Sequence, residues 1–532
     1  MNNKLLDRYN SIPAEKFKFV ENKDNIHDKK LETKPHSYAY DAFLRFCKNK
    51  GSVVAAVIII LLVLFAIIAP WCTPYTVGYY DNTYQGTLPK CSWFANTNFW
   101  DGCSYKTEGY LNYSYYYWMG QELVDTAAED SAHFAIKNQN VDVLENNMYG
   151  YRLDSYHMSG CKYLQISRDE YELIQQYQDE TGRQVIYPTL RVKDRPTARS
   201  VTDHTRANYY YQTKTEKNKP TPVLDENGKI IPAYWTVTAD NRTDNYHSLR
   251  VEGENGFVKN GETYYYMYAR NVSGGDVELR LNYYEYYTFR HSYLLKDGIG
   301  EPNFLFGTTR DGTDVFVCLA SGARFSFIFA ICIAAVNMVF GAIYGAIAGY
   351  YGGAADLVME RVTDILSAVP MMIVITLLKY HMDTSPQVLI LFLAFIATGW
   401  IGMASSTRMQ FYRFKNQEYV LAARTLGAKD WRVIWKHIFP NALGTLVTSC
   451  ALVIPSMIFS ETSLTYLGII DLSSGNITSV GTLIAKGQSE LTSYPHIAMF
   501  PSVFLSLLML SFNLFGNGLR DAFNPSLRGV EE

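Results

Sequence analysis

Residues 52–71 read SVVAAVIIILLVLFAIIAPW, and this uncharged run of 20 residues decides the fold class. At 1.5 Å per residue, a helix of that length crosses a hydrocarbon core about 30 Å thick. A mixed-charge segment of 51 residues precedes the run, so it does not stand where a signal peptide would. The run therefore predicts a membrane-spanning helix, although a mean hydropathy of −0.10 is typical of soluble chains.

Further apolar runs follow in the C-terminal part of the chain. Five of them lack Asp, Glu, Lys and Arg: 325–351, 365–378, 388–406, 441–460 and 497–514. The run 365–378 is short and reaches spanning length only if it extends back to Val358; a buried soluble helix is the alternative. Its neighbours favour spanning, so the sequence predicts six transmembrane helices, with Pro370, Pro455 and Pro501 as candidate kinks.

Between the first two predicted spans, residues 73–300 contain 31 of the 42 tyrosines. That aromatic content excludes a disordered linker and predicts a folded domain. The dipeptides Asn227-Gly228 and Asn260-Gly261 predict β-hairpins, and the Tyr-rich runs 264–266 and 283–287 favour strands.

One helix is also predicted in this block. Ser167 and Glu170 have the spacing of a capping box, and Gly182 is placed to end the helix that follows. We therefore expect an α+β domain. Core packing explains most of its tyrosines, and recognition of a partner explains some.

The cysteines and the net charge limit the chemistry. Cys91 and Cys103 would close a small loop as a disulfide in an oxidising compartment. No CxxC or His/Cys cluster indicates a metal site. The net charge of −3, from 48 basic and 51 acidic residues, gives no reason to expect nucleic-acid binding.

Basic residues next to the spans predict the orientation. Residues 1–50 hold 11 Lys and Arg, and the loop 407–440 holds seven, whereas 379–386 and 461–495 hold one Lys each. Because short cytoplasmic loops are enriched in Lys and Arg, both termini and the loop 407–440 are expected in the cytoplasm. The block 73–300 is then expected outside.

The basic loop contains the strongest motif, EYVLAARTLG at residues 418–427, followed by HIFP at 437–440. Glu418–Leu426 can form a short helix with the small residues Ala422 and Ala423, and Gly427 permits a sharp reversal. Ala428–His437 can form a second short helix that Pro440 ends. Such a pair of helices would make a knob for a partner's groove; an ordinary basic loop is the alternative.

This motif resembles the EAA loop of ATP-binding-cassette importer permeases, in the form of the oligopeptide and dipeptide permeases. Leu421 stands where the general pattern has Glu, and Glu418 lies three residues earlier. The resemblance implies that this loop couples transport to a cytoplasmic ATPase. The implied coupling residues are Glu418, Ala422, Ala423, Arg424, Thr425, Leu426, Gly427, Ala428 and Pro440.

Other segments are similar to the C-subunit of the same family. They are GTTRDGTDVF at 307–316, AGYYGG at 348–353, ETSLTYLG at 461–468 and GNGLRDAFNP at 516–525. Thr309 and Thr313 depart from the family pattern. The resemblance covers residues 40–72 and 301–528, leaves out the domain 73–300, and implies an all-α permease core at 325–528 after an amphipathic segment at 301–324. It also implies a bacterial cell membrane.

Gly341, Gly345 and Gly349 recur at every fourth residue of the second predicted span. Such a smooth face lets helices approach closely in lipid. The face can form a packing seam within this chain or a contact with a second permease, and the sequence leaves both open.

The chain lacks a P-loop, and Gly228-Lys229 is followed by Ile. GxSxG and HExxH motifs are absent too, so the sequence predicts no enzyme and no cofactor in this chain.

The resemblance implies that two partner ATPases bind ATP and magnesium, beside a second permease and an extracellular peptide-binding protein. Peptides are the expected substrate. Nickel, glutathione or antimicrobial peptides are alternatives, and a membrane receptor with a Tyr-rich ectodomain is the rival class.

Overall fold

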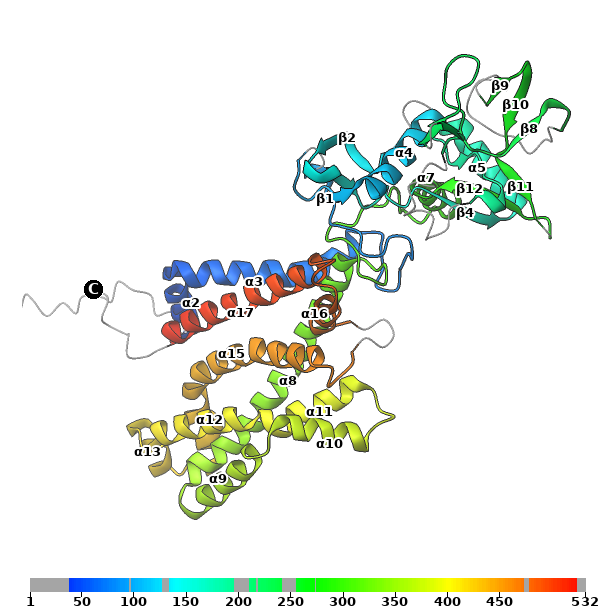
Figure 1. Ribbon diagram of the computed structural model, residues 1–532. Coiled ribbons are helices and arrows are strands. Elements are labelled where there is room, and N and C mark those ends of the chain that lie inside the picture. The colour runs from blue at the N-terminus through cyan, green and yellow to red at the C-terminus, as the bar shows by residue number, and fades with distance from the viewer. Residues whose placement is uncertain are drawn as a thin grey trace, which may run out of the picture.

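The computed structural model describes residues 38–94, 97–126, 134–195, 210–216, 219–241, 255–272, 274–472 and 478–523. Figure 1 shows two regions: a bundle of long helices, and a mixed domain that lies beyond one end of them. We call the second region the inserted domain. Of the predicted tail 1–50, residues 1–37 lie outside the described residues, and α2 (Tyr38–Lys48) precedes the first span.

Within the described residues, five helical segments are long and apolar enough to cross a membrane: Lys50–Trp71, Val315–Tyr351, Gln387–Phe414, Asp430–Tyr466 and His496–Phe523. In element labels these comprise α3 (Lys50–Ile68), α8 (Val315–Tyr351), α11 (Gln387–Gly399) with α12 (Ile401–Phe414), α15 (Phe439–Tyr466) and α17 (His496–Phe523). They contain five of the six predicted runs. The bundle is therefore the polytopic helical fold that the sequence predicts.

The predicted boundary before α8 is wrong. Residues 315–324 are not a separate amphipathic segment but the first turns of α8. The side chain of Asp314 accepts a 2.8 Å hydrogen bond from the Phe316 amide and so caps the helix. A local capping residue, rather than the start of the uncharged run, decides where this helix begins.

The sixth predicted span, 358–378, is not a straight helix. Residues Gly353–Ser367 (α9) and Met371–His381 (α10) meet at a bend of 73° around Pro370. Proline lacks an amide donor and disfavours a helical residue before it, which breaks the hydrogen-bond ladder at that point. The two helices make a sixth span only if the bent pair is counted as one.

The glycine stripe packs inside this chain. A Cβ on Gly345 would lie 2.1 Å from the carbonyl oxygen of Ala404, and one on Gly341 or Gly349 would lie 2.7 Å from the Cβ of Met403 or Phe411. These three neighbours all belong to α12. Of the two alternatives left open by the sequence, the structure shows the internal seam, between α8 and α12.

The inserted domain is built from antiparallel strands with helices beside them. Its strands are β1 (Cys103–Gly109), β2 (Ile136–Val143), β3 (Met148–Asp154), β4 (Cys161–Ile166), β5 (Ile186–Tyr187), β6 (Thr213–Glu216), β7 (Lys219–Pro222), β8 (Thr236–Thr238), β9 (Gly256–Lys259), β10 (Glu262–Tyr266), β11 (Ala269–Asn271) and β12 (Val277–Asn282). They form sheets ordered β1-β3-β2, β8-β10-β9 and β11-β12-β4, with β5 also on β12, and the pair β6-β7. Its α-helices are α4 (Tyr110–Thr126), α5 (Arg168–Thr181) and α7 (Tyr283–Phe289).

Several local predictions for this domain are confirmed. Asn260-Gly261 joins β9 to β10 as a hairpin, and the run 264–266 lies in β10. Ser167 caps α5 by accepting from the Glu170 amide, and Gly182 ends it with φ +70°. In a full capping box the Glu170 side chain would bond back to the Ser167 amide. Here the Glu170 carboxylate instead accepts a 2.9 Å hydrogen bond from the Tyr286 hydroxyl.

Two strand predictions are wrong. The run 283–287 is helix α7, whose first amides are capped by Asn282 through a 3.1 Å bond from the Tyr284 amide. Asn227-Gly228 makes a tight turn, but only the single bridge Leu224–Ile230 forms beyond it. A run of consecutive aromatic residues lacks the alternation of apolar and polar residues that specifies a strand. The capping residue Asn282 therefore favours a helix here.

The predicted disulfide between Cys91 and Cys103 is not formed. Backbone hydrogen bonds close the loop instead, with the Cys91 amide donating to the Trp100 carbonyl at 2.9 Å. The Cys103 thiol lies 3.6 Å from the Asp101 carbonyl oxygen. Cys91 therefore faces Trp100 in the hairpin rather than Cys103.

Candidate coupling site

The predicted motif forms a helix and a reversal at one end of the bundle. Helix α13 spans Glu418–Thr425, with Gln417 extended before it and Glu418 in its first turn. A carboxylate in that position opposes the positive end of the helix dipole, and Arg424 complements the negative end. The local sequence thus supports a helix that is only eight residues long.

Gly427 ends α13 in the manner the sequence predicts. Its amide donates to the Arg424 carbonyl at 2.9 Å, and the Ala428 amide donates to the Ala423 carbonyl at 3.0 Å. This pair of bonds is the Schellman arrangement, which needs a left-handed residue after the last helical turn. Gly427 has φ +79°, and an added Cβ would meet no described atom within 4 Å. Backbone conformation, not crowding, is therefore what requires glycine here.

A buried cluster holds α13 against the long helices. Val420 is fully buried beside Phe411, Ile434 and Tyr350. The Tyr350 hydroxyl at the end of α8 donates a 2.6 Å hydrogen bond to Asp430, and the Arg424 guanidinium lies 4.9 Å from the Tyr350 ring. Val420 and Arg424 of α13 thus both pack near Tyr350 at the end of α8, and Asp430 of α14 bonds to the same residue.

The base of the loop is also tied to α9. Arg408 of α12 binds Asp356 through two bonds of 2.5 and 2.7 Å, and it contacts Glu360 at 3.1 Å. Lys415 donates a 3.0 Å bond to the Gly349 carbonyl. A bidentate guanidinium–carboxylate pair has a defined geometry as well as strength. The segment that leads from α12 into α13 is therefore held against both α8 and α9.

Opposite this anchor, the site exposes large apolar side chains. Leu426 is 88% exposed and Trp431 is 72% exposed, and Leu421 is exposed beside them. Ala422 is exposed and Ala423 is half-buried. Partial burial raises the pKa of Tyr419, whose hydroxyl oxygen accepts a 3.3 Å hydrogen bond from the Asn441 side chain. The predicted apex of small residues is therefore correct only in part, because Leu426 projects from it.

The second predicted helix does not end at Pro440. Helix α14 (Asp430–Arg432) continues through the π-helical turn η9 (Val433–Ile438) into α15, where Pro440 is in the first turn. The first turn of a helix tolerates proline because its amides have no partner within the helix. The loop is thus continuous with a membrane helix, and Trp431, which the motif does not include, lies on it.

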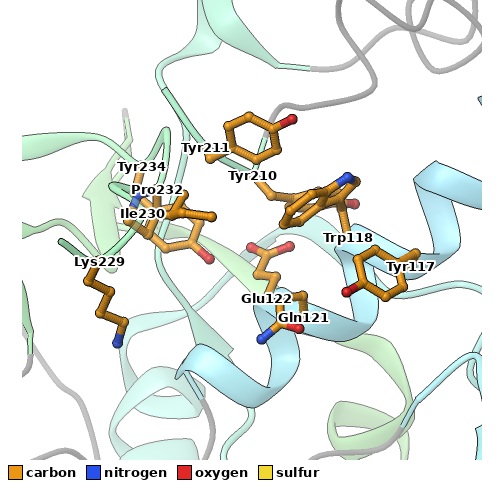
Figure 2. Close-up of a pocket in the computed structure, with 10 residues that line it drawn as sticks. All are labelled: Tyr117, Trp118, Gln121, Glu122, Tyr210, Tyr211, Lys229, Ile230, Pro232 and Tyr234. Carbon is orange, nitrogen blue, oxygen red and sulfur yellow. The ribbon is translucent and has the colours of Figure 1, made fainter. Parts of the chain in front are cut away.

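A second feature is a hollow of about 300 Å³ in the inserted domain. Figure 2 shows Trp118 and Tyr211 on one side, Lys229 and Ile230 on the other, and Glu122 on α4 below them. Glu122 is buried and makes a bidentate pair with Arg280 of β12, one contact of which is 2.8 Å. The carboxylate of Glu122 at the floor of the hollow is therefore neutralised by Arg280, and aromatic side chains form much of the walls. Among the described residues, no cluster of three or more His, Cys, Asp or Glu could hold a metal.

Two family descriptions match the helical region. The binding-protein-dependent transport system inner membrane component matches residues 341–529, and the N-terminal TM domain of oligopeptide transport permease C matches residues 37–89. Neither includes residues 90–340. The match thus contains the candidate coupling site and omits nearly all of the inserted domain.

Individual proteins agree with these descriptions. The oligopeptide transport system permease protein OppC of Bacillus subtilis is 42% identical over 42% of this chain and 72% of its own length. The dipeptide transport system permease protein DppC of the same organism is 38% identical over 42% of this chain and 69% of its own length. OppC of Escherichia coli is 35% identical over 43% of this chain and 74% of its own length. The chain therefore belongs to the OppC/DppC family of binding-protein-dependent transport permeases, the non-enzymatic membrane components of oligopeptide and dipeptide import systems driven by ATP.

Proposed function

We propose that this chain lines one half of a peptide translocation pathway and that α13 passes the movement of a cytoplasmic ATPase to it. The observation that carries the proposal is the exposed apolar tip around Leu426 and Trp431 on a firmly anchored base. Exposed apolar side chains in a rigid projection are what a partner's groove can bury. ATP-driven closure of two such partners would then shift the bundle between inward-facing and outward-facing states.

The test of coupling is Leu426→Asp in the assembled transporter. The charged residue is expected to abolish the partner contact and to reduce peptide uptake and peptide-stimulated ATP hydrolysis at least about tenfold. Leu144→Asp is the matched control, because Leu144 is an exposed leucine of the inserted domain that does not line the aromatic hollow. Normal uptake and normal ATPase retention in Leu426→Asp would refute the coupling role.

Gly427 provides an independent test of the same site. We expect Gly427→Glu to abolish uptake without preventing membrane insertion, because it strains the left-handed backbone and adds charge to the tip. Gly427→Asn is the companion variant, since asparagine adopts this conformation more readily. Uptake that is equal in both variants would mean that the reversal does not matter for coupling.

We also propose that both termini and α13 face the cytoplasm and that the inserted domain lies outside the cell. The asymmetry of Lys and Arg supports this orientation. An impermeant maleimide applied to intact cells should label Glu226→Cys, in the inserted domain, and spare Lys429→Cys, beside α13, in a cysteine-free background. Both positions are exposed. The reverse labelling would overturn the orientation.

For the inserted domain we propose docking of the peptide-binding protein or capping of the pathway entrance, rather than support of the complex alone. The aromatic hollow of Figure 2 supports docking, because Tyr and Trp dominate recognition surfaces. Tyr117→Ala with Lys229→Ala, both at exposed positions, should weaken binding of the binding protein at least about tenfold, whereas Tyr80→Ala elsewhere on the domain should not. Unchanged binding and uptake would leave the domain a stabilising role only.

A further inference from the structure

Five aromatic residues gather where the inserted domain meets the helices. We call them the aromatic rim: Trp71, Trp93, Phe94, Phe99 and Trp100. Trp71 ends the first spanning segment, and the other four lie in the hairpin that begins the inserted domain. The rings of Phe94 and Phe99 lie 6.3 and 5.6 Å from the ring of Trp100. Phe94, Phe99 and Trp100 therefore form one aromatic cluster, with Trp93 next to it in the chain and Trp71 at the end of the first spanning segment.

Ring contacts show how far along the spanning helices α3 and α17 the rim lies. Helices α3 and α17 lie side by side and run in opposite directions (Figure 1). Phe65 meets Phe504 with ring centroids 6.0 Å apart, and Phe500, one helical turn earlier in α17, meets Trp100 at 5.6 Å. In an antiparallel pair, one turn before Phe504 corresponds to one turn after Phe65. Trp100 therefore lies at the level where the first spanning segment ends.

Most of the rim is exposed, and exposed apolar side chains of α3 lead up to it along the chain. Trp93 is 90% exposed, Trp71 is 79% exposed and Phe99 is 65% exposed. On α3, the exposed side chains leading toward the rim are Ile60, Leu61, Leu64, Ile67 and Ile68. An apolar surface of this size is unfavourable in water. Tryptophan, by contrast, concentrates at the boundary between lipid and water, where its ring is buried and its N–H is hydrated.

The hairpin that carries the rim is firmly attached to both regions. Asp101, which follows Trp100, binds Lys137 of β2 at 2.5 Å and Arg152 of β3 at 2.8 Å. The indole nitrogen of Trp100 donates a 2.5 Å bond to the Leu305 carbonyl, close to the start of α8. An immersed rim would therefore fix the height and tilt of the sheet β1-β3-β2 relative to the bilayer.

We propose that the aromatic rim lies in the interfacial layer of the lipid bilayer and anchors the inserted domain to the membrane surface. The occupant of this surface is lipid, because the rim stands at the end of a helix long and apolar enough to cross a membrane, and exposed apolar side chains of that helix lead up to it. This inference does not depend on the transported substrate, on α13 or on which side of the membrane the domain occupies. It gives Trp93, Phe94, Phe99 and Trp100 a role that the aromatic hollow does not share.

Fluorescence quenching tests the proposal on the full chain in phosphatidylcholine nanodiscs. The contribution of Trp93 is the difference between the unaltered chain and Trp93→Phe. A nitroxide on carbon 5 of the acyl chain should quench that contribution at least about twofold more than a nitroxide on carbon 12, and aqueous iodide should quench it weakly. The matched control is Trp235→Phe, because Trp235 bonds to Thr189 and Met267 within the inserted domain. Its contribution should not respond to either lipid label.

A second variant keeps the test decisive if Trp93→Phe alone changes little. Trp93→Ser with Phe99→Ser should retain the fold, since both side chains are exposed. The pair should raise iodide quenching of the remaining rim tryptophans at least about twofold, while Trp93→Tyr with Phe99→Tyr should not. Strong iodide quenching of Trp93, or no quenching by lipid labels, would overturn the proposal in favour of a water-facing or protein-covered rim.

Discussion

The bundle and the inserted domain achieve close packing by opposite means. In the bundle, Gly341, Gly345 and Gly349 remove side chains so that α8 and α12 approach to backbone contact. In the inserted domain, large residues fill the interior, and Tyr84, Tyr156 and Tyr287 are almost entirely buried. Lipid offers no hydrophobic gain for bringing helices together, so close contact must supply the attraction; in water, burying large aromatic rings supplies it.

The hydroxyl groups of the two regions also have different hydrogen-bond partners. Tyrosine hydroxyls inside the inserted domain mostly find partners, such as Tyr79 with Tyr287 at 2.7 Å and Tyr156 with the Leu88 carbonyl at 3.0 Å. In the bundle, most Ser and Thr hydroxyls return to carbonyls of their own helix, as Thr407 does to Met403 at 2.9 Å; Ser52 and Ser326 are exceptions that bond to Leu514 and Glu461 of other helices. Tyrosine therefore links segments distant in sequence, and the small hydroxyl residues satisfy themselves locally.

One of the two largest expected effects comes from filling the glycine seam. Gly345→Leu would place a Cβ 2.1 Å from a backbone oxygen, so we expect a loss of stability at or above the usual upper value of about 3 kcal/mol for overpacking. Thermal unfolding of the chain in nanodiscs measures it. Gly402→Leu on α12 is the matched control, because a Cβ there meets no described atom within 4 Å. Equal melting temperatures for the two variants would show that the seam does not hold the bundle together.

The second effect concerns the buried ion pair of the inserted domain. Glu122→Gln leaves the Arg280 charge inside the domain without its counter-charge, and we expect a loss of about 3–5 kcal/mol. Glu122→Leu with Arg280→Met should restore most of this stability, because both charges are then removed. Chemical unfolding followed by the fluorescence of Trp118 reports on this region. A double variant as unstable as Glu122→Gln would mean that the pair contributes more than charge compensation.

A smaller effect is expected at the border between the regions. Burial raises the pKa of Asp314, just before α8, from 3.8 to about 7. A carboxyl group whose folded pKa is raised binds more protons when folded, so its contribution to stability falls as pH rises from about 4 to about 7. Asp314→Asn retains a cap for the Phe316 amide and should flatten the dependence of melting temperature on pH in this window. A pH dependence of the melting temperature that is the same in Asp314→Asn would contradict the raised pKa of Asp314.

The smallest effect tests whether tyrosine is used in the inserted domain for its ring alone. Among the described residues, the buried hydroxyl of Tyr84 has no hydrogen-bond partner. Because an unsatisfied buried polar group costs about 1–3 kcal/mol, Tyr84→Phe should raise the melting temperature slightly. Tyr287→Phe is the contrasting variant and should lower it, since its hydroxyl is bonded to those of Tyr79 and Tyr75. The opposite order would contradict the ring-packing explanation.

Sequence patterns predict local features of the candidate site well. The helix over 418–425 and the left-handed Gly427 follow from propensity, capping and the freedom of glycine, which act within a few residues. The motif does not indicate that Trp431 is exposed or that Tyr350 binds Asp430, because these properties depend on how α8 and the loop meet. A tryptophan in a short basic loop is the one signal that could have identified Trp431.

By itself, the sequence determined five candidate transmembrane segments, the helix and reversal of the candidate coupling motif, and the presence of a folded Tyr-rich insertion. Spanning length, turn chemistry and composition are properties of a continuous stretch of chain. Only the tertiary structure decided that the glycine stripe faces α12, that α9 and α10 meet at a bend of 73° near Pro370, and that Tyr283–Phe289 is helical. It also decided that Cys91 faces Trp100 rather than Cys103. Each of these depends on which distant segment lies opposite, and that is set by packing the whole chain.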